Sequence, residues 1–255
     1  MISVSGIGFN TIAGLLVVLI GAGAIFLIAV FDRKQSPRPL RPIASFQSLR
    51  RAIGLAVEDG KRLHVSIGNA NILSPNSASA LVGLSTLNRI AQLSMISDRP
   101  PIASSGEGSL AILSQDTLRD AYRSGNALEQ YDPMRARLAG TTPMAYIAGA
   151  IPIIHDESVA GNLLVGSYGS EVALLTDAID QQNAFSLAAS DSLTAQAALY
   201  ATANETLIGE ELFAIPAYLQ AGPFYTASLH AQDILRWIVI AVILGGSALK
   251  LLGIL

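Results

Sequence analysis

A short glycine-containing segment, Gly106-Glu107-Gly108-Ser109-Leu110-Ala111, follows an apolar stretch and opens a helical pattern. Its spacing fits the G-x-G-x-x-A form of turns that bind dinucleotides, in which glycines let a pyrophosphate approach the helix N-terminus. Glu107, however, places a carboxylate where that pyrophosphate would sit. We interpret the segment as a tight strand-to-helix turn with Ser109 as N-cap, and we keep Gly106, Gly108 and Ser109 as candidate ligand-binding residues.

A second glycine-containing turn, Gly166-Ser167-Tyr168-Gly169-Ser170, also joins a strand-like stretch to a helical one. Successive backbone N–H groups in such a turn can form an anion-binding nest. The surrounding half of the chain has no Lys or Arg to neutralise a phosphate, so a neutral or cationic ligand suits this turn better. Gly166, Gly169 and Ser170 are therefore the second set of candidate ligand-binding residues, and a plain glycine-rich turn is the alternative.

The histidines are few and scattered at His64, His155 and His230, and the chain has no cysteine. His155-Asp156-Glu157 is the densest polar cluster and could pair a base with a carboxylate, but adjacent residues point in different directions. No nucleophile elbow, Walker A loop or zinc-protease helix is present in the sequence. We therefore assign no catalytic residue, no metal site and no cofactor.

The elements that would position these turns alternate between helix and strand. This rhythm predicts βαβ units and a single α/β domain over residues 44–225, with a mostly parallel, Rossmann-like sheet flanked by helices. The stretch Pro143 to Ile154 fits either a strand or a buried helix. The expected strands are 63–67, 102–104, 163–166 and 185–188, and the expected helices are 45–58, 78–93, 110–124, 171–181, 193–202 and 210–219.

The excess apolarity of the chain is concentrated at its two ends. Every residue from Ile12 to Phe31 is apolar or Gly, a run that would rise ~30 Å as a helix and match the thickness of a bilayer. Trp237 to Leu255 forms a second apolar run whose only charge is Lys250. The sequence thus predicts a transmembrane helix within residues 1–32 and another within residues 226–255.

A basic, proline-rich linker over residues 33–43 follows the first predicted span. We expect Arg33, Lys34, Arg38 and Arg41 to face anionic lipid, with Arg236 and Trp237 as an interfacial collar before the second span. Because these basic residues all lie on the domain side of the two spans, both termini are predicted outside and the domain cytoplasmic.

Charge is unevenly distributed along the chain. The formal net charge is -3, yet no basic residue occurs between Leu138 and Asp233, where ten acidic residues lie. A basic first half facing an acidic second half permits head-to-tail contacts between copies, and hence a homo-oligomer. A solvated acidic surface is the alternative. A sequence pI of 5.6 disfavours nucleic-acid binding.

Several short blocks of the domain are distinctive in sequence. They are 50–61 (RRAIGLAVEDGK), 97–101 (SDRPP), 113–118 (LSQDTL), 129–133 (EQYDP), 190–192 (SDS) and 208–213 (IGEELF). These blocks resemble an uncharacterised family of bacterial membrane-anchored proteins, described only as a domain of unknown function. The resemblance implies a bacterial origin, hence a location in a bacterial inner membrane, and a membrane-tethered domain, and it transfers no catalytic residue.

Two functions follow as expectations. The first is a structural or scaffolding protein whose membrane-anchored α/β domains self-associate. The second is a membrane-tethered small-ligand-binding or sensor module that uses the turns at Gly106 and Gly166, because open α/β sheets place ligands at the carboxyl ends of their strands. An enzyme that uses His155 and its acidic neighbours is a third, weaker alternative.

Overall fold

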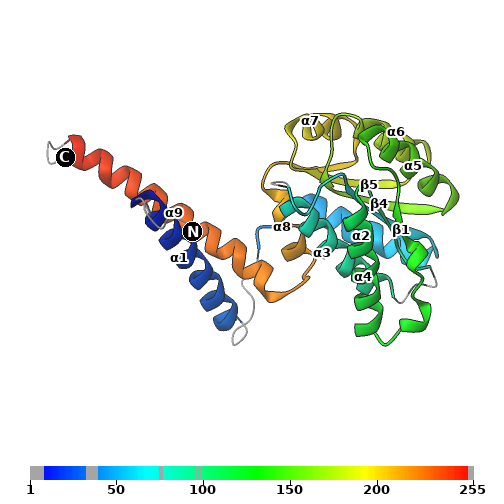
Figure 1. Cartoon of the computed structure of the whole chain (residues 1–255), viewed down its shortest axis with the longest axis horizontal. Helices are drawn as coiled ribbons and strands as arrows, with labels where there is room; N and C mark the ends of the chain where they lie inside the picture. Colours follow the sequence, from blue (N-terminus) through cyan, green and yellow to red (C-terminus); the bar gives the residue numbers. More distant parts are fainter. Residues whose placement is uncertain (1–8, 33–39, 75–76, 96, 98, 252–255) are drawn as a thin grey trace, which may run out of the picture. The chain divides into compact units, whose positions relative to one another are not determined.

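A computed structural model of the chain describes residues 9–32, 40–74, 77–95, 97 and 99–251. Its contacts separate two compact units, which we describe individually. One unit is the α/β domain, Arg41–Ala221, and the other combines Met1–Leu40 with Gly222–Leu255 (Figure 1). The central sheet, which positions every candidate site, lies in the domain.

The domain is built on a six-stranded sheet in the order β3-β2-β1-β4-β5-β6, in which every neighbouring pair is parallel. Its central strands are short apolar runs buried on both faces, the pattern expected of a covered parallel sheet. The strands are β1 (Arg62–Gly68), β2 (Ile102–Ser105), β3 (Ala136–Leu138), β4 (Val159–Ser167), β5 (Phe185–Ser190) and β6 (Glu205–Leu207).

Helices cover both faces of this sheet (Figure 1). One hydrophobic cluster joins the sheet to α2 (Ala44–Glu58), α3 (Ser77–Ser94), α4 (Gly108–Ser124) and α8 (Glu211–Tyr218). A second cluster on the other face joins it to α5 (Pro143–Asp156), α6 (Val172–Gln181) and α7 (Leu193–Thr202). Two short 3-10 helices, η1 (Leu128–Gln130) and η2 (Pro133–Arg135), lead into β3.

The alternation of side chains along β1 separates apolar from polar residues. Leu63, Val65 and Ile67 belong to the cluster on the α3 side of the sheet. Because successive side chains of a strand point to opposite faces, His64 and Ser66 face α5. Both are fully buried, so they require hydrogen-bond partners inside the protein.

The predicted parallel α/β sheet with flanking helices is confirmed, with differences in detail. The short edge strands β3 and β6 were not predicted, and β4 extends beyond the expected 163–166. The ambiguous stretch from Pro143 is helix α5, because Thr142 caps its first turn by accepting from Ala145 N at 3.3 Å and Pro143 suits the first helical position.

The two chain ends of the domain lie beside each other. The rings of Phe46 and Tyr218 stack with centroids 4.3 Å apart. The Tyr218 hydroxyl donates to the carbonyl oxygen of Arg41 at 2.7 Å. The segments that enter and leave the domain therefore do so at one place on its surface.

The second unit pairs α1 (Phe9–Asp32) with α9 (Pro223–Leu251). Gly21 lies against Leu235, and Ala29, Ala227 and Ala231 are buried, so small residues allow the helices to approach closely. By length and composition, α9 alone among the described residues can cross a membrane, while Gly14–Val30 of α1 forms a shorter apolar helix. The expected span at each end is therefore found only at the carboxyl-terminal end.

The residues predicted to meet lipid are only partly covered by the structure. Arg33, Lys34 and Arg38 lie outside the described residues. Arg41 is exposed, and Trp237 is 71% exposed. Arg236 pairs with Asp233 at 3.7 Å, one turn earlier on α9.

Candidate functional site

The strand order reverses direction between β1 and β4. From β1 the chain proceeds outward through β2 to β3, and it then crosses over α5 to β4 on the other side of β1. The helices that follow β1 and β4 consequently cover opposite faces of the sheet. Open α/β sheets bind ligands at the carboxyl edge beside such a switch point.

The first predicted turn reaches this edge but is occupied by its own carboxylate. Gly106 N donates to Gly68 O at 2.8 Å, which joins the ends of β1 and β2. The N-cap of α4 is Glu107, not Ser109: its carboxylate accepts from Leu110 N at 3.0 Å and from the Ser109 hydroxyl. The Ser109 hydroxyl is also the main cause of the lowered pKa of Glu107. A phosphate on this helix N-terminus would meet that negative charge, as the sequence indicated.

The second predicted turn is organised in the same manner. Gly166 lies within β4, and a Cβ on it would fall 1.8 Å from the Ile67 carbonyl oxygen, so the glycine is required by the close approach of β1. Gly169 N donates to Glu171 Oε1 at 2.9 Å, and Ser170 is exposed. The sheet thus places Gly106 and Gly166 on either side of the end of β1, where they serve packing.

The carboxyl edge contains two buried acceptors that sequence reasoning missed. Asn69 follows Gly68, whose φ of +73° allows the sharp exit from β1, and Asp191 follows β5. Asp191 Oδ2 accepts from the Ser79 hydroxyl at 2.8 Å. Asp191 Oδ1 and Asn69 Oδ1 are buried without a hydrogen-bond partner in the structure. A polar side chain directly after a buried parallel strand was the available signal.

A buried chain of hydrogen bonds crosses the sheet beneath this edge. His64 Nδ1 lies 3.0 Å from Asn162 Oδ1, and Nε2 lies 2.8 Å from Ser104 Oγ. Ser104 Oγ lies 2.9 Å from the Tyr146 hydroxyl, which also contacts Ser66 Oγ. The chain therefore connects four elements, namely β4, β1, β2 and α5, through side chains with no exposed surface.

Tyr168 continues this buried chain to the carboxyl edge. Its hydroxyl donates to the Ser66 carbonyl oxygen at 2.7 Å, and its backbone N donates to Ser190 Oγ at 3.3 Å. Tyr168 begins the turn after β4, and Ser190 immediately precedes Asp191. The hydroxyl chain consequently contacts the turns after β4 and β5 at the carboxyl edge.

Burial determines the protonation of the side chains in this hydrogen-bond chain. Desolvation lowers the pKa of His64 to about 4, so its ring is neutral at pH 7. It raises the pKa of both Tyr146 and Tyr168, which therefore stay protonated. With the proton on Nδ1, His64 donates to Asn162 Oδ1 and accepts from Ser104 Oγ. Each hydroxyl in this hydrogen-bond chain then has an acceptor for its own proton. The tautomer is assigned from these partners.

The polar cluster at His155 separates in the structure. His155 is exposed and its Nδ1 lies 2.7 Å from Gln182 Nε2, whereas Glu157 pairs with arginines. No base and carboxylate pair therefore forms from these neighbours. Among the described residues, no group of three or more metal-ligating side chains is present.

Charge at the carboxyl edge restricts the ligand. The turns after β1, β2, β4 and β5 contain no Lys or Arg, while Glu107, Glu171 and Asp191 lie in three of them. An anionic ligand would lack a counter-charge here. A ligand that donates hydrogen bonds, neutral or cationic, would instead satisfy the two unpartnered acceptors.

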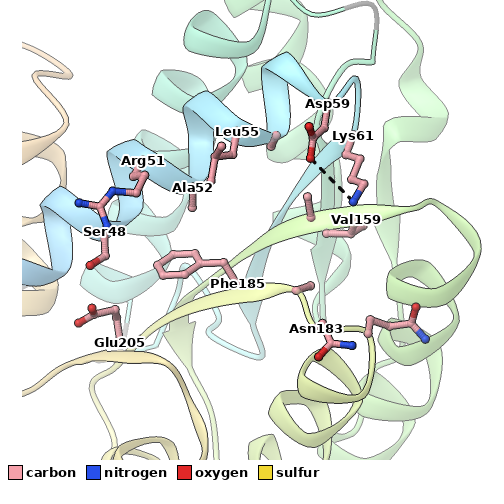
Figure 2. A pocket seen from close by; sticks show the side chains of 14 residues that line it. Ser48, Arg51, Ala52, Leu55, Asp59, Lys61, Val159, Asn183, Phe185 and Glu205 are labelled. Carbon is pink, nitrogen blue, oxygen red and sulfur yellow. Dashed lines mark ion pairs between the residues drawn. The ribbon is translucent and has the colours of Figure 1, made fainter.

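A separate groove lies at the amino edge, between α2 and the starts of β4, β5 and β6 (Figure 2). It has a volume of about 430 Å³, and Phe185 lines it together with charged side chains of both signs. Asp59 and Lys61 pair across 4.0 Å, and both are more than half exposed. This open, mixed lining specifies no ligand class.

The chain belongs to the family described as Domain of unknown function (DUF6754), whose match covers residues 4–255. This assignment agrees with the resemblance seen in the sequence blocks. Comparison with curated proteins and with solved structures found no match. The function must therefore be argued from the site itself.

Proposed function

We propose that this protein is a membrane-tethered module that binds a small polar ligand at the carboxyl edge of its sheet, between the turns after β1 and β5. One observation carries the proposal: Asn69 Oδ1 and Asp191 Oδ1 are buried acceptors without a partner. Buried polar groups are almost always paired, so an unpaired acceptor at a switch point calls for a donor from outside the chain. The ligand class is a neutral or cationic molecule bearing N–H or O–H groups.

The tether would consist of both apolar helices. We propose that α9 crosses a bacterial inner membrane and that α1 crosses it as well, because the apolar run in the sequence, residues 12–31, extends beyond the shorter apolar helix Gly14–Val30. Arg33, Lys34, Arg38, Arg41 and Arg236 would then contact anionic lipid, and Trp237 would lie at the interface. The adjacent chain ends at Phe46 and Tyr218 support this arrangement, because both tethers leave one place on the domain. The termini are then outside and the domain is cytoplasmic.

The ligand site can be tested by thermal unfolding of the full chain in mild detergent. Three groups of probes would be compared at equal ionic strength: cationic amines, neutral amides and polyols, and anionic phosphates. We expect stabilisation by a member of the first two groups, and its loss in Asp191→Asn and in Asn69→Ala.

A matched control is Asp177→Asn, since Asp177 is an exposed carboxylate on α6 that accepts from Gln181 Nε2 at 2.9 Å. This variant should keep the ligand-induced stabilisation. A stabilising ligand that acts equally on the wild type, Asp191→Asn and Asp177→Asn would exclude the carboxyl-edge site.

Self-association is a second candidate, favoured by the segregation of charge between the two edges of the sheet. Arginines gather at the amino edge and carboxylates lie in the turns of the carboxyl edge. One copy could therefore dock edge to edge on the next, as a scaffold would. Native mass measurement in mild detergent should show oligomers that dissociate as salt rises, and a monomer at every salt concentration would exclude this function.

A further inference from the structure

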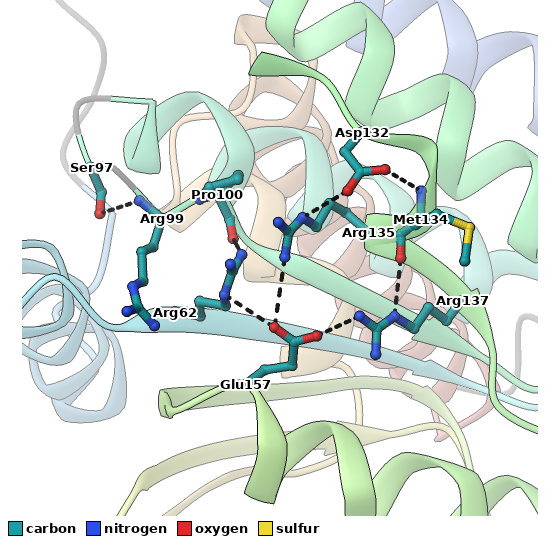
Figure 3. A network of polar contacts seen from close by, with 9 residues as sticks. All are labelled: Arg62, Ser97, Arg99, Pro100, Asp132, Met134, Arg135, Arg137 and Glu157. Carbon is teal, nitrogen blue, oxygen red and sulfur yellow. Dashed lines mark hydrogen bonds and ion pairs between the residues drawn. The ribbon is translucent and has the colours of Figure 1, made fainter.

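The amino edge of the sheet carries a cluster of four arginines, Arg62, Arg99, Arg135 and Arg137, which we name the arginine cluster. Arg62 begins β1, Arg99 precedes β2, and Arg135 and Arg137 lie at the start of β3. Because amino ends of parallel strands meet at one edge, these residues gather there. Figure 3 shows Arg62, Arg135 and Arg137 around Glu157, with Arg99 farther from Glu157 on the side of Arg62.

The carboxylates beside the arginine cluster do not neutralise all of its positive charge. Glu157 Oε2 lies 3.3 Å from Arg62 Nε and 3.6 Å from Arg135 Nη1, and its other oxygen pairs with Arg137. Asp132 lies 3.3 Å from Arg135 Nε. Four guanidinium groups thus face two carboxylates among the described residues. Burial, followed by the charge of Arg135, lowers the pKa of Arg62.

Two buried donors of the cluster have a carboxylate nearby but make no well-aligned hydrogen bond with it. Arg62 Nε and Arg135 Nε are buried and make no hydrogen bond, although each lies at ion-pair distance from a carboxylate. The Tyr122 hydroxyl, on a side chain only 2% exposed, likewise has no partner. The Tyr122 ring lies 6.4 Å from the ring of Tyr131, which directly precedes Asp132, so the phenol packs against the segment that contains Arg135. Burial raises the pKa of Tyr122 to about 12, and the charges of Arg135 and Arg62 oppose that rise.

The geometry points to an oxyanion site of the phosphate type at the arginine cluster, completed by the Tyr122 hydroxyl. A phosphate group carries the negative charge that the cluster lacks and several acceptor oxygens, and guanidinium groups bind it with two parallel hydrogen bonds. Arg99 is exposed and the Arg137 side chain is 36% exposed, so an anion meets these two first. The site is at the opposite edge from the proposed ligand site and does not depend on it.

The test is titration of the full chain in mild detergent with inorganic phosphate, at constant ionic strength and against chloride, followed by thermal unfolding. We expect a saturable rise in melting temperature.

Arg99→Gln should weaken the apparent affinity about tenfold, because it removes a charged donor. Glu157→Gln should strengthen binding, since it removes the competing carboxylate. Arg123→Gln, at an exposed arginine of α4 that pairs with Asp120, is the matched control and should bind as the wild type does.

Tyr122→Phe separates binding from folding. Removing an unpartnered buried hydroxyl should leave the melting temperature without phosphate unchanged or higher, while the phosphate-induced rise becomes smaller. No saturable effect of phosphate in the wild type, or equal effects in Arg99→Gln and Arg123→Gln, would overturn the site.

Repeating the titration in lipids of defined composition distinguishes a lipid headgroup from a free phosphate compound as the occupant of the site. The titration would be repeated in nanodiscs of phosphatidylcholine alone and in nanodiscs that also contain phosphatidylglycerol. Loss of the phosphate response only in the second would identify a lipid headgroup as the occupant. An equal response in both would identify a free phosphate compound.

Discussion

His64 is the side chain whose burial has the clearest thermodynamic consequence. Its folded-state pKa is lowered to about 4, whereas the unfolded ring titrates near 6.5. As the pH falls from 6.5 to 4, the unfolded chain therefore takes up a proton that the folded chain does not. The free energy of unfolding should decrease by roughly 3 kcal/mol over this interval from this residue alone.

The contribution of His64 is isolated by a difference between variants. Urea denaturation of His64→Gln at pH 7 and at pH 4.5 should show a smaller loss of stability than the wild type does. His155→Gln is the control because His155 is exposed, and it should retain the wild-type pH dependence. An equal pH dependence in all three proteins would contradict a buried, neutral His64.

The hydroxyl of Tyr146 connects Ser104 and Ser66 in the same buried chain. Tyr146→Phe should lower the free energy of unfolding by about 1–3 kcal/mol, because it leaves buried serine hydroxyls short of a partner. Tyr200→Phe, at a tyrosine that is 72% exposed, should change it by less than about 0.5 kcal/mol. Thermal or urea unfolding of both variants measures this difference.

Few of the residues at the candidate site could be predicted from the sequence. The glycine spacing predicted two strand-to-helix turns, and turns follow β2 and β4, but close contacts explain Gly106 and Gly166. Asn69 and Asp191 carry no local motif. Their significance arises from strand order, which depends on contacts between residues far apart in the chain.

Among the elements, the turns before α4 and α6 allow packing and ligand roles to be distinguished. Gly166→Ala should destabilise the domain by about 2–4 kcal/mol or prevent folding, because the new methyl group meets the Ile67 backbone oxygen at 1.8 Å. Gly108→Ala, which meets nothing within 4 Å, should be neutral or slightly stabilising. Comparison of the two melting temperatures checks the prediction, and equal losses would contradict it.

Most helices and central strands were predictable because their apolar periodicity is local. Helix α7, for example, spans Leu193–Thr202 as expected. The edge strands β3 and β6 were missed because each has only three residues and contains polar side chains, so neither presents a buried run. The first apolar run was correctly placed in a helix, although only α9 has the length and composition of a span among the described residues.

For the whole molecule, the proposed topology can be tested by labelling because the sequence has no cysteine. Single substitutions Ser3→Cys and Ser170→Cys would be introduced separately. An impermeant maleimide should label Ser3→Cys in intact cells or spheroplasts, and Ser170→Cys only after the inner membrane is permeabilised. Labelling of Ser170→Cys in intact spheroplasts would contradict a cytoplasmic domain.

The central claim is that a polar ligand binds at the carboxyl edge of the sheet, and hydrogen–deuterium exchange of the full chain in detergent tests its location most directly. With the stabilising amine, amide or polyol present at saturation, we predict slower exchange in residues 69–74, 77–79 and 190–196, and unchanged exchange in α2 beside the amino-edge groove. Protection confined to α2, or no protection in the turns after β1 and β5, would contradict the proposed site.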